Sequence, residues 1–434
     1  MLLRGIKGKR IDGYKSMSTA RPVREYLNPE YVYIPLVQGA AKLRVVVNEG
    51  DHVNVGTVVA LREDHFPLPI YSSVSGTVGK VKKMWHSSAR MVEMLEIKND
   101  CLDTVDPNIK ACENPSELTR KEIVEKIKNA GLVGLGGAGF PTYVKYLGDQ
   151  NKDVVLINGV ECEPFLTCDY ENMLNYPDKL FRGLTYLMKA AGAERGVIAI
   201  KNYRTDLVEL FQPYLEQYPN ISVFLTEDVY PAGWEKYIVE KVLGKTYNRL
   251  PAEVGAVVNN SSTCMAVCDA VELGMPQVER TTTITGEGIK EPQNFRIKVG
   301  TRVQELVALA GGYVDGLDTT KSYYVAGGPM TGKAIMIDDL VADACLCAIE
   351  VLKDKKAEYL PNCLGCGKCS ERCPAHLTPT AIRQALLSKD AKLVGELNVN
   401  ACILCGMCSY VCPSRIELTD SMVQAKDFLR KAGK

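Results

Sequence analysis

The sequence lacks the features that mark membrane-spanning and secreted proteins. It contains no uncharged run of about 18 or more apolar residues. Its first ten residues, MLLRGIKGKR, lack the apolar core of a secretory signal. We therefore expect a chain that does not span a membrane and that stays in the cytosol.

The sequence also lacks an excess of charge of either sign. Its 52 Lys and Arg residues balance 52 Asp and Glu residues, and no local basic patch stands out. A neutral chain has no global field that would collect nucleic acid, so we expect no nucleic-acid partner. The 434 residues, 46% of them apolar, can bury cores in two to four domains, which excludes disorder as the main state.

Histidine is scarce, whereas cysteine is abundant. The chain has only 4 His, and we expect His52, His65 and His86 to be scattered surface residues rather than metal ligands. It has 16 Cys. In a reducing compartment so many cysteines indicate metal ligands or buried thiols rather than disulfides.

Half of the cysteines form two identical runs near the C-terminal end, each with the spacing C-x2-C-x2-C-x3-C-P. In this pattern three thiolates on a tight loop hold one face of a cubane cluster, and the fourth reaches across to the other cluster. We therefore assign the ligands of one [4Fe-4S] cluster as Cys363, Cys366, Cys369 and Cys412, and those of the other as Cys402, Cys405, Cys408 and Cys373. Small residues in the loops leave room for the inorganic sulfides: Gly365, Gly367 and Gly406.

A pair of zinc knuckles is the alternative interpretation of these runs. Zinc sites use two C-x2-C pairs for each ion, which fits two four-cysteine runs closed by proline poorly. The duplicated segment instead resembles the bacterial two-cluster ferredoxin module. Such a module moves single electrons, so the remaining residues should contain whatever exchanges electrons with it.

The other eight cysteines share no ligand spacing, and we expect most of them to be buried thiols. They are Cys101, Cys112, Cys162, Cys168, Cys264, Cys268, Cys345 and Cys347. The spacing of Cys264 and Cys268 predicts one face of a helix, and that of Cys345 and Cys347 predicts one face of a strand. A redox or ligand site at either pair is the alternative.

A glycine-rich loop lies in the middle of the chain. A capping box at Thr119–Glu122 predicts a helix that ends before Gly131. The loop that follows includes Gly134, Gly136, Gly137 and Gly139, with Lys145 shortly after. A dinucleotide-binding fingerprint needs a strand before its glycines, but here a helix precedes them. The glycine pattern alone is therefore weak evidence for a nucleotide site. Its backbone N–H groups and Lys145 could hold a phosphate, and a tight interhelical connection is the alternative.

Repeated strand and helix patterns after the loop predict a mostly parallel sheet with polar residues at its carboxyl edge. The predicted strands are 154–157, 196–201 and 222–225, and a helix is predicted from Pro177 to Gly192. The polar residues that follow strands or open helices are Asn158, Glu161, Glu163, Glu235, Asn259 and Asn260.

Four segments in this order, GLGGAGFPT, INGVECEP, YPAGWEK and VVNNSST, followed by the two-cluster module, resemble the C subunit of the Rnf-type ferredoxin:NAD oxidoreductase complex. More distantly, they are similar to the NADH-binding flavoprotein subunit of complex I. The resemblance implies non-covalent FMN with NAD(H) stacked above it. It places these residues at FMN: Gly134, Gly136, Gly137, Lys145, Asn158, Glu161, Glu163, Asn259 and Asn260. It places Gly139, Phe140 and Glu235 nearer the nicotinamide nucleotide, and it gives Glu161, Glu163 and Lys145 the catalytic positions.

Trp234 stands where the pattern expects an acidic or small residue, and we expect it to fill a core.

The flanking segments complete a multidomain α/β and α+β protein. Short β-branched runs punctuated by glycine predict an N-terminal β barrel-sandwich of the lipoyl type, unmodified because Ser73–Ser75 occupies the hairpin tip where a lysine would be needed. A strand, helix and strand after the flavin domain resemble a β-grasp, SLBB-like domain. The predicted boundaries are 1–100 for the barrel-sandwich, 115–275 for the FMN and NADH domain, 276–345 for the β-grasp domain and 346–434 for the helical ferredoxin domain.

The predicted function is electron transfer between NAD(H), FMN and two [4Fe-4S] clusters. The resemblance implies a peripheral subunit on the cytoplasmic face of the membrane, attached to the other subunits of an ion-translocating electron-transport complex, with ferredoxin as a candidate partner. Two alternatives stand beside this prediction. One is a soluble paralogue that delivers NADH electrons to a dedicated reductase, such as a proline- or cobalamin-reducing system. The other is a cluster-only electron-carrying adaptor whose glycine loop binds nothing.

Overall fold

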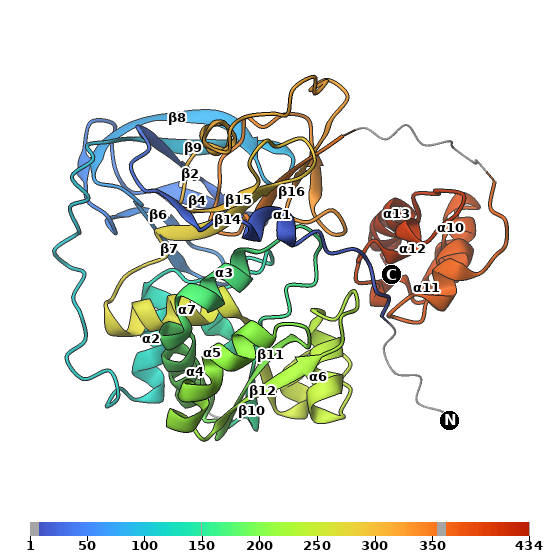
Figure 1. Cartoon of the computed structure of the whole chain (residues 1–434), viewed down its shortest axis with the longest axis horizontal. Coiled ribbons are helices and arrows are strands. Elements are labelled where there is room, and N and C mark those ends of the chain that lie inside the picture. The colour runs from blue at the N-terminus through green and yellow to red at the C-terminus, as the bar shows by residue number, and fades with distance from the viewer. Residues whose placement is uncertain (1–7, 149, 354–361, 434) are drawn as a thin grey trace.

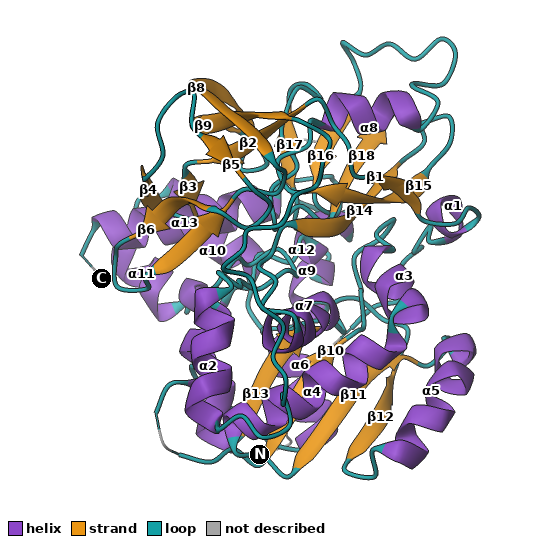
Figure 2. Cartoon of the chain, turned by 90° about the vertical axis from the view of Figure 1, so that its left-hand side faces the viewer, coloured by secondary structure: helices purple, strands orange, loops and turns teal. Residues whose placement is uncertain are grey.

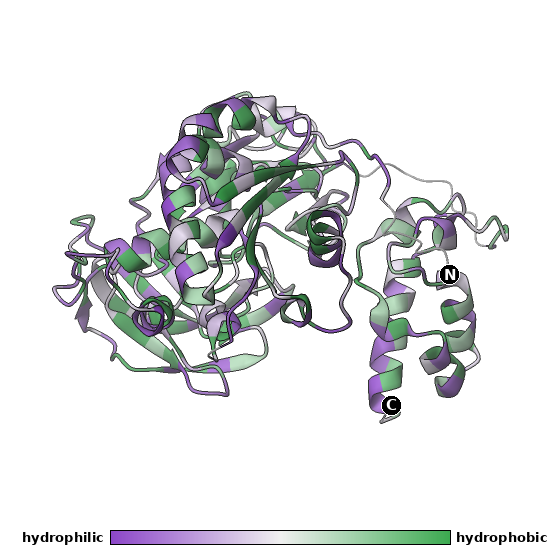
Figure 3. Ribbon diagram, turned by 90° about the horizontal axis from the view of Figure 1, so that it is seen from below, coloured by the Kyte–Doolittle hydropathy of each residue, from purple (hydrophilic) through white to green (hydrophobic). Residues whose placement is uncertain are grey.

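The computed structural model describes residues 8–148, 150–353 and 362–433. Two β-rich parts lie together above a mixed helix and strand part, and a helical module lies to one side (Figure 1). Seen from below and coloured by hydropathy, the strands of the main body are largely hydrophobic (Figure 3). Within the described ranges, no helix has both the length and the apolar character needed to cross a membrane.

The first β-rich part is a sandwich of two four-stranded sheets, as the sequence predicts. One sheet has the order β2 (Tyr31–Pro35), β9 (Arg90–Asn99), β8 (Gly76–His86), β5 (His52–Val53). The other has the order β3 (Val37–Gln38), β4 (Ala41–Val45), β6 (Val58–Arg62), β7 (Leu68–Tyr71). Apolar side chains from both sheets, including Val32, Val59 and Ile97, are buried between them. The predicted hairpin tip is buried as well, and Ser73 donates to the carbonyl oxygen of Val299.

The mixed part contains a parallel sheet whose spatial order is β12 (Ile221–Thr226), β11 (Arg195–Lys201), β10 (Val154–Asn158), β13 (Ala256–Asn260). Figure 2 shows these four strands side by side in the lower half of the molecule. The helices of this part are α2 (Arg120–Asn129), α3 (Cys168–Asn175), α4 (Pro177–Ala191), α5 (Thr205–Gln217), α6 (Glu235–Leu243) and α7 (Ser261–Glu272), with short helices η1 (Thr142–Tyr146) and η2 (Pro251–Val254).

The local signals for two of these helices are confirmed. Thr119 and Glu122 form the predicted capping box at the start of α2. Helix α4 opens at Pro177, where a missing N–H group has no cost, and closes at Gly192, whose φ of +61° is in the left-handed region. Both helices pack on the sheet in one apolar core, where Ile127 and Leu184 are fully buried.

The second β-rich part is a six-stranded sheet in the order β1 (Arg24–Tyr26), β15 (Gln293–Lys298), β14 (Glu279–Thr285), β18 (Ala348–Leu352), β16 (Tyr323–Ala326), β17 (Lys333–Ile335). It is accompanied by α1 (Ser16–Thr19) and α8 (Val303–Leu309). Strands β1 and β18 come from segments on either side of the predicted β-grasp boundaries. The N-terminal segment is therefore built into this sheet, and β18 leads from it towards the helical module.

The helical module contains α9 (Lys368–Glu371), α10 (Pro379–Leu387), α11 (Ala391–Glu396), η3 (Val399–Ala401), α12 (Met407–Tyr410) and α13 (Leu418–Lys431). Helices α10 and α13 pack through a core that includes Ile382, Met422 and Ala425. The two short helices α9 and α12 each follow a glycine in the left-handed region, Gly367 and Gly406. Each cysteine run thus wraps a tight loop and enters a helix, which the spacing predicts.

Two expectations about individual segments are wrong. Cys345 and Cys347 do not lie on a strand but in a turn and loop before β18, because the carboxylate of Asp343 accepts a hydrogen bond from the backbone N–H of Cys345 and bends the chain. His86 is not a surface residue. It is only 14% exposed and forms an ion pair with Asp343, with Nε2 and Oδ2 3.0 Å apart.

Candidate functional site

The eight clustered cysteines line two separate cavities in the helical module. One cavity, of about 200 Å³, is lined by Cys363, Cys366, Cys369 and Cys412. The other is lined by Cys373, Cys402, Cys405 and Cys408. Each cavity therefore combines three cysteines of one run with the last cysteine of the other run.

The chemistry of these cavities fits iron–sulfur clusters. Backbone N–H groups of Gly365 and Leu404 donate to the sulfurs of Cys363 and Cys402 at 3.4 Å, as in loops that surround cluster sulfurs. Burial raises the pKa of Cys405 to about 12, and binding to iron would favour its thiolate form. Within the described ranges, no three His, Cys, Asp or Glu side chains converge closely enough to hold a single metal ion. A cubane instead takes each thiolate on a different iron.

The glycine loop lies against the carboxyl edge of the parallel sheet. The N–H group of Leu135 donates to the hydroxyl of Thr263 at 2.9 Å, which ties the loop to the start of α7. A Cβ on Gly136 would lie 3.3 Å from the side chain of Asn260, so the loop and β13 approach closely. Gly137 has a φ of +95° and open space around its Cα hydrogen. The loop thus presents backbone rather than side chains to a ligand.

Several predicted polar residues meet at this edge. Asn158 and Asn260 are paired neighbours at the ends of β10 and β13. Asn158 donates to the carbonyl oxygen of Gly233 at 2.8 Å, which brings the segment before α6 to the same place. Lys145 donates to the carbonyl oxygen of Val258 at 2.6 Å. The structure therefore brings together residues from four of the segments that the sequence singles out.

The groups at this edge fit an anionic, hydrogen-bonding cofactor such as FMN. Burial lowers the pKa of Lys145, while Glu235 opposes that shift, and no carboxylate of the described residues lies within ion-pair distance of its ammonium group. The side-chain oxygen of Asn259 is buried and has no hydrogen-bond partner among the described residues. A partly buried ammonium without a counter-charge and an orphaned amide oxygen would both be stabilised by a ligand that pairs with them. A phosphate and a flavin ring edge would supply those partners.

Glu161 is engaged inside the protein. Its carboxylate accepts a hydrogen bond from the N–H group of Asp169 at 2.8 Å and lies 3.7 Å from the ammonium of Lys15. Lys15 also donates to the carbonyl oxygens of Glu161, Glu163 and Leu166. Burial raises the pKa of Glu161, and Lys15 opposes the shift. This ion pair holds the INGVECEP segment in place.

Glu163 points to the six-stranded sheet. Its carboxylate accepts hydrogen bonds from the N–H group of Met330 and the hydroxyl of Thr331. Burial raises the pKa of Glu163, and the hydrogen bond from Thr331 opposes it. Glu163 thus joins the mixed part to the loop after β16.

Of the residues predicted near the nicotinamide nucleotide, Gly139 and Phe140 lie on the glycine loop, whereas Glu235 opens α6. Glu235 accepts a hydrogen bond from the hydroxyl of Tyr247 at 2.9 Å. Phe140 is 39% exposed, and its ring meets that of Phe66 edge to face, with centroids 5.6 Å apart. Phe66 belongs to the barrel-sandwich, so two parts of the chain contribute this exposed aromatic pair. Trp234 is partly buried against the core beside α6, as expected.

Tyr230 connects the mixed part to one of the cysteine cavities. Its ring is buried, and its hydroxyl donates to the carbonyl oxygen of Cys405 at 2.7 Å. Its backbone pairs with Lys9, whose ammonium lies 5.2 Å from the ring centre of Tyr410. The cavity of Cys373, Cys402, Cys405 and Cys408 is therefore the one beside the carboxyl edge of the sheet.

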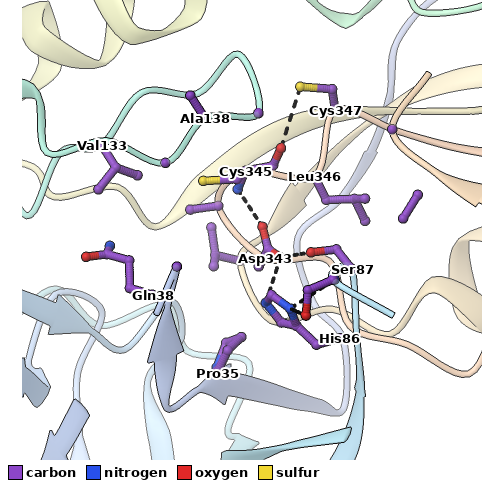
Figure 4. A pocket seen from close by; sticks show the side chains of 18 of the residues that line it. Pro35, Gln38, His86, Ser87, Val133, Ala138, Asp343, Cys345, Leu346 and Cys347 are labelled. Carbon is purple, nitrogen blue, oxygen red and sulfur yellow. Dashed lines mark hydrogen bonds and ion pairs between the residues drawn. The ribbon is translucent and has the colours of Figure 1, made fainter. Parts of the chain in front are cut away.

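A cavity of about 480 Å³ lies where the barrel-sandwich, the six-stranded sheet and the glycine loop meet. Figure 4 shows His86 and Ser87 each bonded to Asp343 on its wall, with Cys345 and Cys347 beside them. Burial tends to raise the pKa of Asp343, but hydrogen bonds and the charge of His86 hold it below its usual value. This network connects β8 to the segment that precedes β18.

Sequence reasoning alone missed Lys15, Asp169 and Phe66. Lys15 and Phe66 lie in segments without a recognisable pattern, and their partners are far away in the chain. Asp169 follows the INGVECEP segment and accepts hydrogen bonds from Asn260 and Ser262, both at 2.6 Å. One sequence signal could have identified Asp169: it is an acidic residue in the first turn of a helix that closely follows the INGVECEP segment.

Four family models match successive parts of the chain. They describe the RnfC barrel sandwich hybrid domain at residues 4–101, the Nuo51 FMN-binding domain at 127–269, the SLBB domain at 281–334 and the 4Fe-4S dicluster domain at 356–413. Their order agrees with the predicted order of domain types.

Curated relatives are similar over most of their length. The C subunit of the Na(+)-translocating ferredoxin:NAD(+) oxidoreductase complex of Acetobacterium woodii is 34% identical over 379 residues, which cover 86% of this chain and 85% of the relative. The C subunit of the proton-translocating complex of Clostridium ljungdahlii is 33% identical over 86% of this chain and 82% of the relative. The C subunit of the ion-translocating oxidoreductase complex of Rhodobacter capsulatus is 30% identical over 87% and 74%.

Among solved structures, the fold is similar to a chain of the NAD+-reducing [NiFe]-hydrogenase in the H2-reduced state. The TM-score is 0.51 with 16% sequence identity, over 75% of this chain and 63% of that chain. The same hydrogenase in the air-oxidized state has a TM-score of 0.50 and 17% identity, over 73% of this chain and 64% of that chain.

Proposed function

Because the chain belongs to the family of C subunits of ion-translocating ferredoxin:NAD(+) oxidoreductase complexes, we propose that it passes electrons between NAD(H), FMN and two [4Fe-4S] clusters. Bound FMN exchanges electron pairs with nicotinamide and single electrons with iron–sulfur clusters. One observation carries the proposal most directly. The hydroxyl of Tyr230, at the carboxyl edge of the parallel sheet, donates to the backbone of Cys405 in one of the cysteine cavities.

The residues of the chain bind the cofactor and hold the loops around it in position. In this proposal the N–H groups of the glycine loop and the ammonium of Lys145 hold the phosphate, and the free oxygen of Asn259 holds the ring edge. Glu161 positions the loop after β10 through its bonds to Lys15 and Asp169. Glu163 fixes the segment 330–331 against that loop through its hydrogen bonds to Met330 and Thr331.

We assign the cluster ligands by cavity. Cys363, Cys366, Cys369 and Cys412 hold the outer cluster, and Cys373, Cys402, Cys405 and Cys408 hold the cluster beside Tyr230. A cluster held in the second cavity would be the one nearer the mixed part, because that cavity lies against Tyr230. The proposed domain boundaries are 1–100, 115–275, 276–345 and 346–434, and the six-stranded sheet also takes β1 and β18 from the neighbouring segments.

The family supports a proposal for the partners. The chain works with the other subunits of a membrane electron-transport complex, on the cytoplasmic face, and ferredoxin is the candidate electron partner on the cluster side. Ion translocation falls to the membrane subunits. NADH binds beside the glycine loop, with Gly139, Phe140 and Glu235 as the residues nearest to it.

Anaerobic purification followed by flavin, iron and sulfide analysis tests this function. We expect FMN together with about eight irons, and NADH should reduce a one-electron acceptor through the protein. Lys145→Met should lose FMN binding at least tenfold but keep its iron, whereas Lys121→Met, at an exposed lysine on α2, should keep both. A protein with full iron content, no flavin and no NADH oxidation would instead be a cluster-only adaptor.

A further inference from the structure

Three cysteines outside the cluster cavities come together beneath the glycine loop. Cys168 opens α3, whereas Cys345 and Cys347 precede β18. The side chains of Cys168 and Cys347 interact with each other. Both side chains are at least nine-tenths buried, in a small apolar cluster with Leu166 and Ala348. Two thiols in direct contact are the first requirement for a disulfide.

A buried guanidinium lies beside this pair. Arg280, 8% exposed, donates to the carbonyl oxygen of Ala344 and interacts with the thiol of Cys347. The hydrogen bond from Cys168 lowers the pKa of Cys347, and Arg280 lowers it further, against the effect of burial. The same contact raises the pKa of Cys168. The two thiols are therefore unequal, with Cys347 the better thiolate and Cys168 the proton donor.

The better thiolate is also the accessible one. Cys347 and Cys345 line the cavity of about 480 Å³, whereas Cys168 does not. Burial raises the pKa of Cys345, and the neighbouring carboxylate of Asp343 raises it further. A small molecule in the cavity therefore meets one activated sulfur, with Cys168 behind it.

Cys347 is also bonded to the glycine loop. Its thiol donates to the carbonyl oxygen of Leu135 at 3.3 Å. Cys345 lies next to the same loop, since a Cβ on Gly139 would be 3.2 Å from its sulfur. Oxidation of Cys347 would therefore remove a hydrogen bond to the glycine loop.

We propose that Cys347 and Cys168 form a redox-active thiol pair that low-molecular-weight disulfides oxidise through the cavity. The Cys347 thiolate attacks one sulfur of the small disulfide, which forms a mixed disulfide and releases one thiolate. The sulfur of Cys168 then attacks Cys347, which forms the Cys168–Cys347 disulfide and releases the second small thiol, while the proton of Cys168 leaves with it. Two protein thiols lose two electrons, and one small disulfide gains them. Cys347 then has no S–H group, so its bond to Leu135 is lost.

The inference requires only these thiols and the cavity, one wall of which is the glycine loop of the proposed cofactor site. It is tested on the full chain with its clusters bound, treated anaerobically with one equivalent of an aromatic disulfide. Peptide mapping under non-reducing conditions should find residues 168 and 347 joined. Backbone hydrogen exchange should increase across residues 134–139, because the loop has lost a hydrogen bond.

Variants separate the two sulfurs. Cys168→Ala should stop at the mixed disulfide on Cys347, and Cys347→Ser should give no modification of Cys168. Cys264→Ala removes another fully buried thiol, on α7, and should behave as the unmodified protein. Labelling of Cys345 in preference to Cys347, or the absence of the joined peptide in protein that retains its iron, would overturn the proposal.

Discussion

At the scale of single residues, Glu350 is a carboxyl group without a partner. It lies fully buried on β18, and neither of its oxygens has a hydrogen-bond partner among the described residues. Burial raises the pKa of Glu350 to about 9, with a further contribution from Glu163 and an opposing one from Lys15. The side chain is therefore neutral at pH 7, next to the junction that Glu163 makes with the loop after β16.

The raised pKa makes stability depend on pH. The unfolded chain loses the proton of Glu350 near pH 4.5, whereas the folded protein keeps it up to about pH 9. This group therefore lowers the free energy of unfolding progressively as the pH rises from about 4.5 to about 9. In Glu350→Gln this contribution disappears. The free energy of unfolding should then fall less steeply with pH, by up to about 1.4 kcal/mol per pH unit. Anaerobic urea unfolding at pH 6, 7 and 8 measures the slopes.

A matched control for this measurement is Glu113→Gln, which changes an exposed glutamate before α2. Its slope should equal that of the unchanged protein. Equal slopes for Glu350→Gln and the unchanged protein would mean that Glu350 is ionised in the folded state.

At the scale of elements, the two cysteine runs exchange their last members. Helices α9 and α12 carry the third cysteine of each run to its own cavity, while the fourth lies beyond the helix and faces the other cavity. The two cavities are therefore built jointly, and neither run is a self-contained site.

Double variants test whether each cluster takes its ligands from both cysteine runs or from one run only. Cys363 and Cys373 belong to one run but to different cavities, so Cys363→Ala with Cys373→Ala should lose both clusters and nearly all iron. Cys363 and Cys412 share a cavity, so Cys363→Ala with Cys412→Ala should keep about four irons. Iron analysis after anaerobic reconstitution measures the difference. Retention of half the iron in the first variant, with none in the second, would show that each run holds its own cluster.

At the scale of the whole molecule, the helical module is held against the rest by backbone contacts. The hydroxyl of Tyr230 reaches the carbonyl oxygen of Cys405, and the carbonyl oxygen of Met330 lies so close to Gly406 that a Cβ there would be only 2.5 Å from it. The N-terminal segment pairs with Tyr230 in the same place. Three segments far apart in sequence therefore meet at one cavity.

Two glycine substitutions test this docking. Gly406→Ala should push the module away from Met330, whereas Gly367→Ala meets no atom within 4 Å, although both glycines have a φ above +70°. Both substitutions therefore place similar strain on the backbone, but only Gly406→Ala affects the contact with Met330. In anaerobic stopped-flow experiments, reduction of the clusters by NADH should slow at least tenfold in Gly406→Ala and much less in Gly367→Ala. Similar slowing in both would assign the effect to local strain.

The sequence by itself determined many of the elements and the chemical type of the candidate cofactor residues. The capping box of α2, the proline and glycine that bound α4, and the repeated cysteine spacing are local signals, because each depends on residues within one or two turns of chain. The parallel pairing of β10, β11 and β12 also follows from alternating strands and helices. The place of β13 beside β10, which brings Asn260 next to Asn158, comes from the structure.

Only the tertiary structure decided which distant groups meet. The contacts of Cys168 with Cys347, of Tyr230 with Cys405 and of Lys15 with Glu161 join segments whose local sequences carry no sign of one another. Burial is equally non-local. Glu350 reads as an ordinary polar residue of a strand, and its raised pKa comes from the apolar side chains that enclose it and from Glu163. Packing between elements, rather than the pattern within them, sets these properties.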